Sequence, residues 1–493
     1  MIQSNAWNRE INKGRWRIFF TSSYFSMVVI VIALLLGGVV IALLLGGAFG
    51  KLGSYASWAT IVTMAMALII VLRQNELAAT LVVVLHMYVD WYLQLYVVAP
   101  VLGLALLLIF FLARSPQYPW ASPDAIWLWV LFLGLSIFPA IQGATDLSDA
   151  LYYYPNIVLG SLIVFWLGIV IARDLTSVRL FFKVVSLFGM LIALHTIITA
   201  LTGTFLLATP RINTYLASVN DFTLVRSSIN RVGSFLGNPD WNGTFLSMMV
   251  FVPVGLLVST SSQLARLIYL GQIVLILLAL LFTYTTLSWI AVIVGLIPLF
   301  MLIGPGLRRV WFPALLGATI VGIYYVYPNQ STQLVLHSIA PNDAQLRMGA
   351  WQTAWRVIQA FPLTGVGLGL YNYLLRAEPY RVPAQYAPLA HPHNAYLELG
   401  AMAGLPVLIV FIALLSLALG FALRNWAQVD VRSRSLLSGG IAAVVALCIN
   451  SGGINGWTLP PIAATGWLIL GVISSPQLAR SRKAQIEQEK SDT

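Results

Sequence analysis

Charged residues are scarce in this chain of 493 residues: they make up 9% of it, whereas hydrophobic residues make up 59%. The mean hydropathy is +0.87. A soluble fold is excluded, because a compact domain has too little interior to bury that much apolar surface. Near-uncharged runs recur along the chain, each close to the roughly 20 residues that cross a bilayer. The sequence therefore predicts an all-α, polytopic integral membrane protein.

Cysteine and metal-ligand patterns are also nearly absent. Cys448 is the single cysteine of the sequence, so no internal disulfide can form. Carboxylates are few in the predicted outer loops, and the closest spacing of ligand-type side chains is His391-x-His393. A structural or catalytic metal usually takes three or four such ligands. We therefore expect no metal and no cofactor.

The net charge of +11 does not indicate a nucleic-acid partner, because the basic residues are scattered between apolar runs. The predicted partner is the lipid bilayer. Nineteen of the 27 lysines and arginines fall in segments predicted on the inner side and eight on the outer, which favours cytoplasmic termini. We count fourteen candidate spans, or twelve without the weak runs near residues 57 and 76. The fourteen start near residues 22, 57, 76, 95, 124, 156, 180, 242, 267, 289, 311, 395, 436 and 460.

Four segments follow from this pattern. Residues 1–203 are predicted as a transmembrane scaffold and residues 204–423 as a core that includes a large outer loop, 327–394. Residues 424–475 are predicted as the C-terminal transmembrane helices, and residues 476–493 as a disordered cytoplasmic tail.

Seven arginines lie in two loops predicted on the same, non-cytoplasmic side. They are either solvated loop residues or groups that converge on an anion, for which the planar guanidinium fork is suited. The first loop, about 204–241, holds Arg211, Arg226 and Arg231, and the second holds Arg347, Arg356, Arg376 and Arg381.

The second loop contains a stretch with helical periodicity. Its apolar positions are Met348, Trp351, Trp355 and Ile358. They predict an amphipathic helix that either lies in the membrane interface or packs on top of the bundle. The glycine-rich segment 365–369 has no preceding strand and is interpreted as a flexible turn rather than a nucleotide-binding loop.

Two other polar features have structural alternatives. Asp146 and Asp149, beside three tyrosines in an outer loop, could bind a sugar or a cation, although their spacing is unspecific. His195 is isolated in an apolar run, which is typical of a hydrogen-bonded structural histidine.

The stretch HPHNAYLELGAMAG at residues 391–404 carries the most chemistry. His393-Asn394, nine residues and then Gly404-Leu405 at the start of an apolar helix resemble the signature of the O-antigen ligase and O-antigen polymerase superfamily. Two upstream pieces are similar to the family's in the expected order: the run from Arg231 to Pro239, and Arg347 followed by the run at residues 362–369. One departure is Trp289, which stands where many members carry an arginine.

The resemblance implies a bacterial inner-membrane glycosyltransferase with its active site on the outer face. The donor would be a polyprenyl-diphosphate-linked oligosaccharide, and the acceptor a glycan or lipid-core hydroxyl. His393 holds the family position for the base that activates the hydroxyl, and the alternative for it is a hydrogen-bonded loop residue.

The remaining site residues follow from the same resemblance. Arg231, Arg347 and Arg226 are the candidates for binding the leaving diphosphate. Asn394 and Glu398 are expected to orient the imidazole, and His391 to shape the loop. Ligase and polymerase stay open, since both need these groups, and the alternatives are a bicarbonate-carrier-like transporter and an inactive assembly scaffold.

Overall fold

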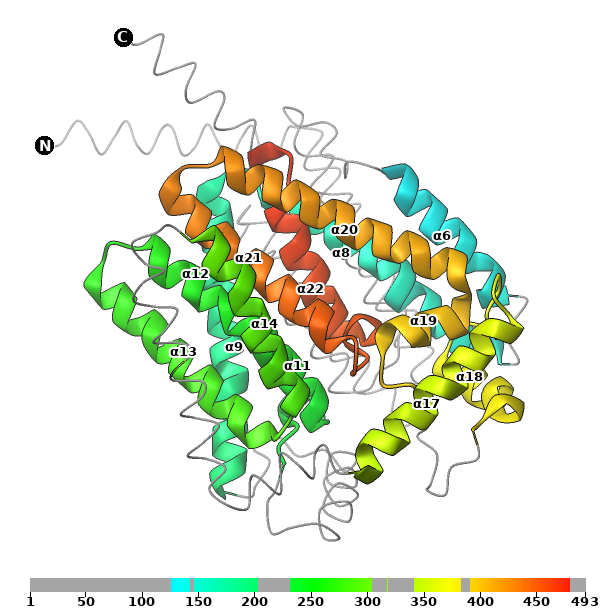
Figure 1. Cartoon of the computed structure of the whole chain (residues 1–493). Helices are drawn as coiled ribbons and strands as arrows, with labels where there is room; N and C mark the ends of the chain where they lie inside the picture. The colour runs from blue at the N-terminus through cyan, green and yellow to red at the C-terminus, as the bar shows by residue number, and fades with distance from the viewer. Residues whose placement is uncertain are drawn as a thin grey trace, which may run out of the picture. The chain divides into compact units, whose positions relative to one another are not determined.

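The computed structural model describes residues 126–141, 146–202, 231–303, 317, 341–382 and 391–478, without the side chains of residues 148 and 341–346. These residues form helices joined by turns, and no strand occurs among them (Figure 1). They all belong to the second of two compact units, residues 110–493. The helices are α6 (Ile126–Ile141), α7 (Leu147–Tyr153), the π-helix η1 (Tyr154–Leu159), α8 (Gly160–Ile171), α9 (Leu175–Thr202), η2 (Ser234–Leu236), α11 (Pro239–Met249), α12 (Phe251–Ser259), α13 (Gln263–Thr283), α14 (Thr286–Leu302), α17 (Pro341–Ala360), α18 (Leu370–Ala377), η3 (Glu378–Tyr380), α19 (Ala395–Ala403), α20 (Leu405–Gln428), α21 (Val431–Asn450), η4 (Gly456–Thr458) and α22 (Pro460–Ile473).

Six helical segments in the described part are long and apolar enough to cross a membrane. They are Asp149–Ile171, Leu175–Thr202, Pro239–Ser259, Gln263–Thr283, Leu405–Gln428 and Val431–Asn450. Helices α6, α14 and α22 are shorter apolar helices. The prediction of an all-α polytopic membrane protein is confirmed. The spans predicted near residues 22, 57, 76, 95 and 311 lie outside the described residues.

One predicted span begins later than expected. The span placed near residue 395 starts instead at Leu405, because Gly404, with φ of +88°, ends α19 and turns the chain into α20. The preceding α19 is only 9 residues long and stands between the outer loop and the span.

Helix α21 joins two groups of helices. It packs against α11, α12 and α14, and also against α20 and α22, while α22 packs against α8 (Figure 1). Glycine permits the closest approaches: a Cβ added at Gly168 of α8 would lie 2.6 Å from the Leu468 carbonyl oxygen of α22. Close backbone contact of this kind is how membrane helices gain packing energy without a hydrophobic driving force.

A cluster of aromatic rings fills the space around α22. The ring centroid of Trp467 lies 5.1 Å from that of Trp129 and 5.9 Å from that of Phe165. Trp457 stands 5.1 Å from the same Trp467 ring. All four side chains are buried, so this cluster is the apolar core between α6, α8 and α22.

The amphipathic helix predicted in the outer loop is α17, and Ile358 of its predicted apolar face is buried. Met348 and Trp355, expected on the apolar face, are 53% and 51% exposed. The buried side is made of mostly small residues at helical spacing and packs against α19. These residues are Ala350, Thr353, Ala354, Val357 and Ile358. The small side chains on this face let α17 approach α19 closely.

The glycine-rich segment after α17 is a turn, as predicted, but the described backbone is tied down rather than flexible. The amide of Val366 donates to Ala401 at 2.9 Å and that of Gly367 to Met402 at 3.0 Å. Gly365, Gly367 and Gly369 have positive φ, a conformation that strongly favours glycine. The turn therefore anchors the end of α17 to the end of α19.

Candidate functional site

Asp240 joins two of the arginines singled out in the sequence. Its Oδ1 lies 2.5 Å from Nη2 of Arg231, and its Oδ2 lies 3.3 Å from Nη2 of Arg347. The side chains of the three residues are 16%, 34% and 24% exposed, respectively. The sequence folds this way locally because Asn238 caps α11 by accepting from the Asp240 amide at 2.7 Å, and Pro239 suits the first helical position.

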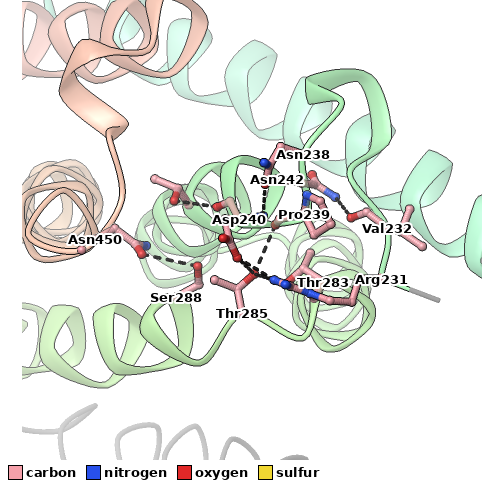
Figure 2. A network of polar contacts seen from close by, with 12 residues as sticks. Arg231, Val232, Asn238, Pro239, Asp240, Asn242, Thr283, Thr285, Ser288 and Asn450 are labelled. Carbon is pink, nitrogen blue, oxygen red and sulfur yellow. Dashed lines mark hydrogen bonds and ion pairs between the residues drawn. The ribbon is translucent and has the colours of Figure 1, made fainter. Parts of the chain in front are cut away.

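Further hydrogen bonds hold each guanidinium from a different segment. Nε of Arg231 donates to the Thr283 carbonyl at 3.0 Å, and its Nη2 donates to Oγ1 of Thr285 at 3.4 Å (Figure 2). Nη1 of Arg347 donates to the Gly453 carbonyl, in the turn that follows α21. This arginine cluster, made of Arg231, Asp240 and Arg347, thus connects the ends of α11, α13, α14, α17 and α21.

The charge balance at this cluster favours an anion. Among the described residues, two guanidinium groups meet on one carboxylate. Helices α11, α14 and α19 also begin near it, at Pro239, Thr286 and Ala395. Helix N-termini carry a partial positive charge, so they add to the attraction for a negative ligand.

Beneath the cluster, a neutral polar network enters the bundle. Oγ of Ser288 donates to Oδ1 of Asn450 at 3.4 Å (Figure 2). Nδ2 of Asn450 donates to Oγ of Ser247 at 2.5 Å. These buried groups link α14, α21 and α11, and hydrogen bonds of this kind join helices within membranes.

His393 lies at the start of α19, next to the turn that holds Arg347. Asn394 caps this helix: its Oδ1 accepts from the amides of Tyr396 at 3.0 Å and Leu397 at 3.1 Å. Its Nδ2 donates to the Gly452 carbonyl at 2.8 Å. Asn394 was expected to orient the imidazole, and these contacts with backbone groups fix the helix start instead.

The electrostatic surroundings of His393 keep its imidazole neutral. Its pKa is lowered to about 3, chiefly by burial and then by the neighbouring His391 and Arg347, while Asp240 opposes them. The imidazole thus interacts electrostatically with Arg347 and Asp240, two members of the arginine cluster. Its Nδ1 is buried without a hydrogen-bond partner in the part of the chain that the structure describes.

Backbone strain gathers at the same place. Among the described residues, the non-glycine residues with positive φ are Ser234, Tyr284 and His393, at 50°, 51° and 50°. Each adjoins a segment that contributes to the cluster. Such backbone conformations cost about 1 kcal/mol or more, and they concentrate at functional sites.

His195 holds the first of these strained turns. Its Nδ1 lies 2.9 Å from Oγ of Ser234, and its ring lies 4.0 Å from the ring of Phe235. This is the hydrogen-bonded structural role predicted for it. It fixes the turn that begins at Arg231.

Glu398 and His391 lie behind His393. Oε1 of Glu398 accepts from the Tyr153 hydroxyl at 3.2 Å, and Oε2 lies 3.4 Å from Nδ1 of His391. The latter contact does not have hydrogen-bond geometry. Glu398 was expected to orient the imidazole of His393, but it approaches the ring of His391.

The remaining outer arginines do not converge on the cluster. Arg226 and Arg211 lie outside the described residues. Arg376 donates to the Val366 carbonyl at 3.3 Å, and Arg381 pairs with Glu378 at 2.7 Å. Arg356 is exposed. Of the described outer arginines, two therefore form the cluster and three have other surroundings.

The acidic pair at the start of α7 contacts the start of α18. Oδ2 of Asp149 accepts from the amides of Tyr371 at 2.8 Å and Asn372 at 3.1 Å, at the start of α18. Asn372 in turn accepts from the Asp146 amide at 2.7 Å. The described residues contain no group of three or more His, Cys, Asp or Glu side chains that could hold a metal ion.

Sequence reasoning missed Asp240, Thr285 and the Gly452–Gly453 turn. The run Asn238-Pro239-Asp240 does predict a capped helix start, but the spacing of the sequence does not bring Arg347 to it. Residues 452 and 453 fall in the segment predicted as C-terminal transmembrane helices, so the site crosses that predicted boundary. Trp289, in place of the family's arginine, is buried in α14.

A comparison with curated proteins gives no significant match. Residues 272–412 match the family model described as O-Antigen ligase. The matched segment includes Thr285, Arg347 and His393, whereas Arg231, Asp240 and the Gly452–Gly453 turn lie outside it. The match confirms, over these residues, the resemblance to the O-antigen ligase superfamily that the motifs indicate.

Proposed function

We propose that this protein transfers a glycan from a polyprenyl-diphosphate-linked donor to an acceptor hydroxyl on the outer face of the bacterial inner membrane. The observation that carries the proposal is the meeting of Arg231 and Arg347 on Asp240, beside a neutral His393. Ligase and polymerase reactions both need these groups.

The arginine cluster binds the diphosphate. Two guanidinium groups meet on Asp240, and helix N-termini add positive potential. The guanidinium fork matches phosphate oxygens in geometry. Arg347 reaches Asp240 at the start of α11, and Asp240 also contacts Thr285, which precedes α14, the helix that buries Trp289. It therefore supplies, from another loop, the cation that Trp289 does not provide.

The chemical step is a displacement at the anomeric carbon. His393 takes the proton of the acceptor hydroxyl, and the oxygen forms a bond with that carbon. The bond between the carbon and the diphosphate oxygen breaks, and the diphosphate leaves with the electron pair. Attack from the opposite face inverts the anomeric configuration.

Donor binding makes His393 a better base. Its low pKa reflects burial first, and then the neighbouring His391 and Arg347. A bound diphosphate brings at least two negative charges, which favour the protonated imidazole and raise its pKa toward the working range. The base thus becomes effective only when the donor is in place.

The test separates binding from chemistry. In proteoliposomes with a polyprenyl-diphosphate-linked oligosaccharide, His393→Ala is expected to lose about 10²–10⁴-fold in transfer rate. Arg347→Ala is expected to lose about 10²–10³-fold, because a group that stabilises the leaving charge is gone. Farnesyl diphosphate should bind His393→Ala as it binds the unmodified protein, and bind Arg347→Ala more weakly.

Arg356→Ala is the matched control, since Arg356 is an exposed arginine on the same helix as Arg347. It should transfer and bind normally. Full transfer by His393→Ala would remove the base assignment. Unchanged diphosphate binding by Arg347→Ala would remove the arginine assignment.

A further inference from the structure

A second buried carboxylate, which the proposed reaction does not use, stands behind the base. The side chain of Glu398 is 1% exposed. It accepts one hydrogen bond, from the Tyr153 hydroxyl at 3.2 Å. A buried carboxylate is costly unless hydrogen bonds or a positive group compensate it. His391 lies beside it, with Nδ1 3.4 Å from Oε2 and without hydrogen-bond geometry.

His391 connects this carboxylate to His393 by two contacts. The two imidazole rings are stacked, with centroids 3.9 Å apart and planes 28° apart. The His393 amide donates to Nδ1 of His391 at 3.3 Å. The ring of His391 therefore contacts both the side chain and the backbone of His393.

The backbone is irregular at both ends of this series of contacts. The π-helix η1 begins at Tyr154, directly after Tyr153. At the other end His393 has a φ of +50°. Single π-helical turns and left-handed non-glycine residues are unfavourable locally and are often found at functional sites. Both irregularities fall beside residues that contact one another through Glu398 and His391.

We propose that Tyr153, Glu398 and His391 form a positioning chain that fixes the imidazole of His393 in its reactive orientation. This proposal rests on the proposed function, in which His393 is the base. The Glu398 carboxylate lies against the His391 ring, and that ring contacts His393 by stacking and through its amide. His391 was expected only to shape the loop, and here it acquires a defined role.

The chain also accommodates the proton that His393 receives. When the proton arrives, the stacked ring of His391 must not repel it, and the adjacent Glu398 carboxylate offsets positive charge on the ring pair. The groups facing Glu398 are Tyr153, His391 and, from α18, Tyr373. Those facing His393 are His391, Arg347 and Asp240.

The first test uses Glu398→Gln and Tyr153→Phe in the full-length protein, with the same proteoliposomes and donor. A misplaced base should lower kcat by about tenfold or more, as supporting contacts of active-site groups do. KM for the donor should stay within about twofold, because the arginines are untouched. Glu378→Gln and Tyr380→Phe, in the exposed η3 turn, are matched controls expected to keep the unmodified kcat.

The second test separates the two contacts made by His391. His391→Phe keeps a ring for stacking but removes Nδ1, whereas His391→Asn keeps a hydrogen-bond acceptor and removes the ring. Each should retain more activity than His391→Ala, which lacks both. His391→Phe should also move the acid limb of kcat/KM to higher pH, since His391 lowers the pKa of His393. A residue with a merely structural role would not move that limb.

The outcomes distinguish the two proposals. Normal transfer by His393→Ala would overturn the proposed function. An inactive His393→Ala with normal kcat and normal pH profiles in Glu398→Gln and Tyr153→Phe would overturn the positioning chain alone. If Glu398→Gln fails to fold, Tyr153→Phe decides, because it removes one hydroxyl and keeps the ring.

Discussion

Two helix contacts in the described part of the chain are built from opposite kinds of residue. Helices α8 and α22 meet through Gly168 and Gly471, beside the rings of Phe165 and Trp467. The ends of α11, α14 and α17 instead meet through charged and hydroxyl groups around Asp240. The first contact depends on shape, and the second on charge and hydrogen-bond direction.

The difference shows where stability and function reside. Close apolar packing holds helices together in lipid without favouring any ligand. The charged cluster holds helix ends together through the Asp240 carboxylate, which both guanidinium groups contact. If it is the proposed diphosphate site, it is also a weak point of the fold that an anion should strengthen.

The largest effect is expected for Asp240→Ala, which leaves two guanidinium groups without their shared carboxylate. Breaking a partly buried ion pair from one side should lower the free energy of unfolding by about 3 kcal/mol. Inorganic pyrophosphate should restore more stability to this variant than to the unmodified protein. Thermal unfolding in detergent, with and without pyrophosphate, measures both. Equal stabilisation of the two proteins would contradict the comparison.

A smaller loss is expected for Gly471→Ala at the apolar contact. The added methyl would press into the Phe165 carbonyl oxygen, and overpacking of this kind costs about 1–3 kcal/mol. Pyrophosphate should not rescue this variant. The control is Gly134→Ala, where nothing lies within 4 Å and the better helix propensity should stabilise slightly. The same unfolding assay compares them, and equal stability would show that the glycine contact is not tight.

Two helix caps sharpen the comparison at the scale of about 1 kcal/mol. Asn394→Ala and Ser262→Ala each remove an N-cap, the former at the candidate site and the latter at the exposed start of α13. Their stability losses should be similar. Transfer activity should fall only for Asn394→Ala, because this cap fixes the start of α19 directly after His393. A comparable activity loss in Ser262→Ala would mean that activity follows global stability.

The smallest change is expected with pH. Because the pKa of His393 is lowered from 6.5 to about 3, the imidazole of the free enzyme stays neutral well below pH 6.5. Between pH 7.5 and 5.5, kcat/KM should change less than about twofold, whereas an unperturbed histidine base would lose about tenfold. An acid limb near pH 6.5 would contradict the burial of this residue.

The same shift has a consequence for stability. A histidine that is harder to protonate in the fold than in the unfolded chain favours folding fully above pH 6.5, and this contribution is lost as pH falls toward 3. Acid unfolding should therefore be milder in His393→Asn, which has no titrating ring.

Local patterns predicted many of the described elements. Apolar runs predicted the spans, and the helix of the outer loop was expected from its periodicity. The residues of α17 that face α19 were not all predicted, since Ala354 is buried whereas the more hydrophobic Trp355 is exposed. Packing geometry overrode hydrophobicity at that face.

The sequence alone determined the membrane architecture, the start of α11 at Asn238-Pro239 and the family of the matched segment, since each depends on residues that are neighbours along the chain. Only the tertiary structure decided that Asp240 bridges Arg231 and Arg347, and that Gly453 and Tyr153 belong to the same surroundings. These partners are separated by up to hundreds of residues, and a helix pattern carries no information about which helix ends meet. Charge and packing at those meeting points, which depend on three-dimensional distance, select the arrangement.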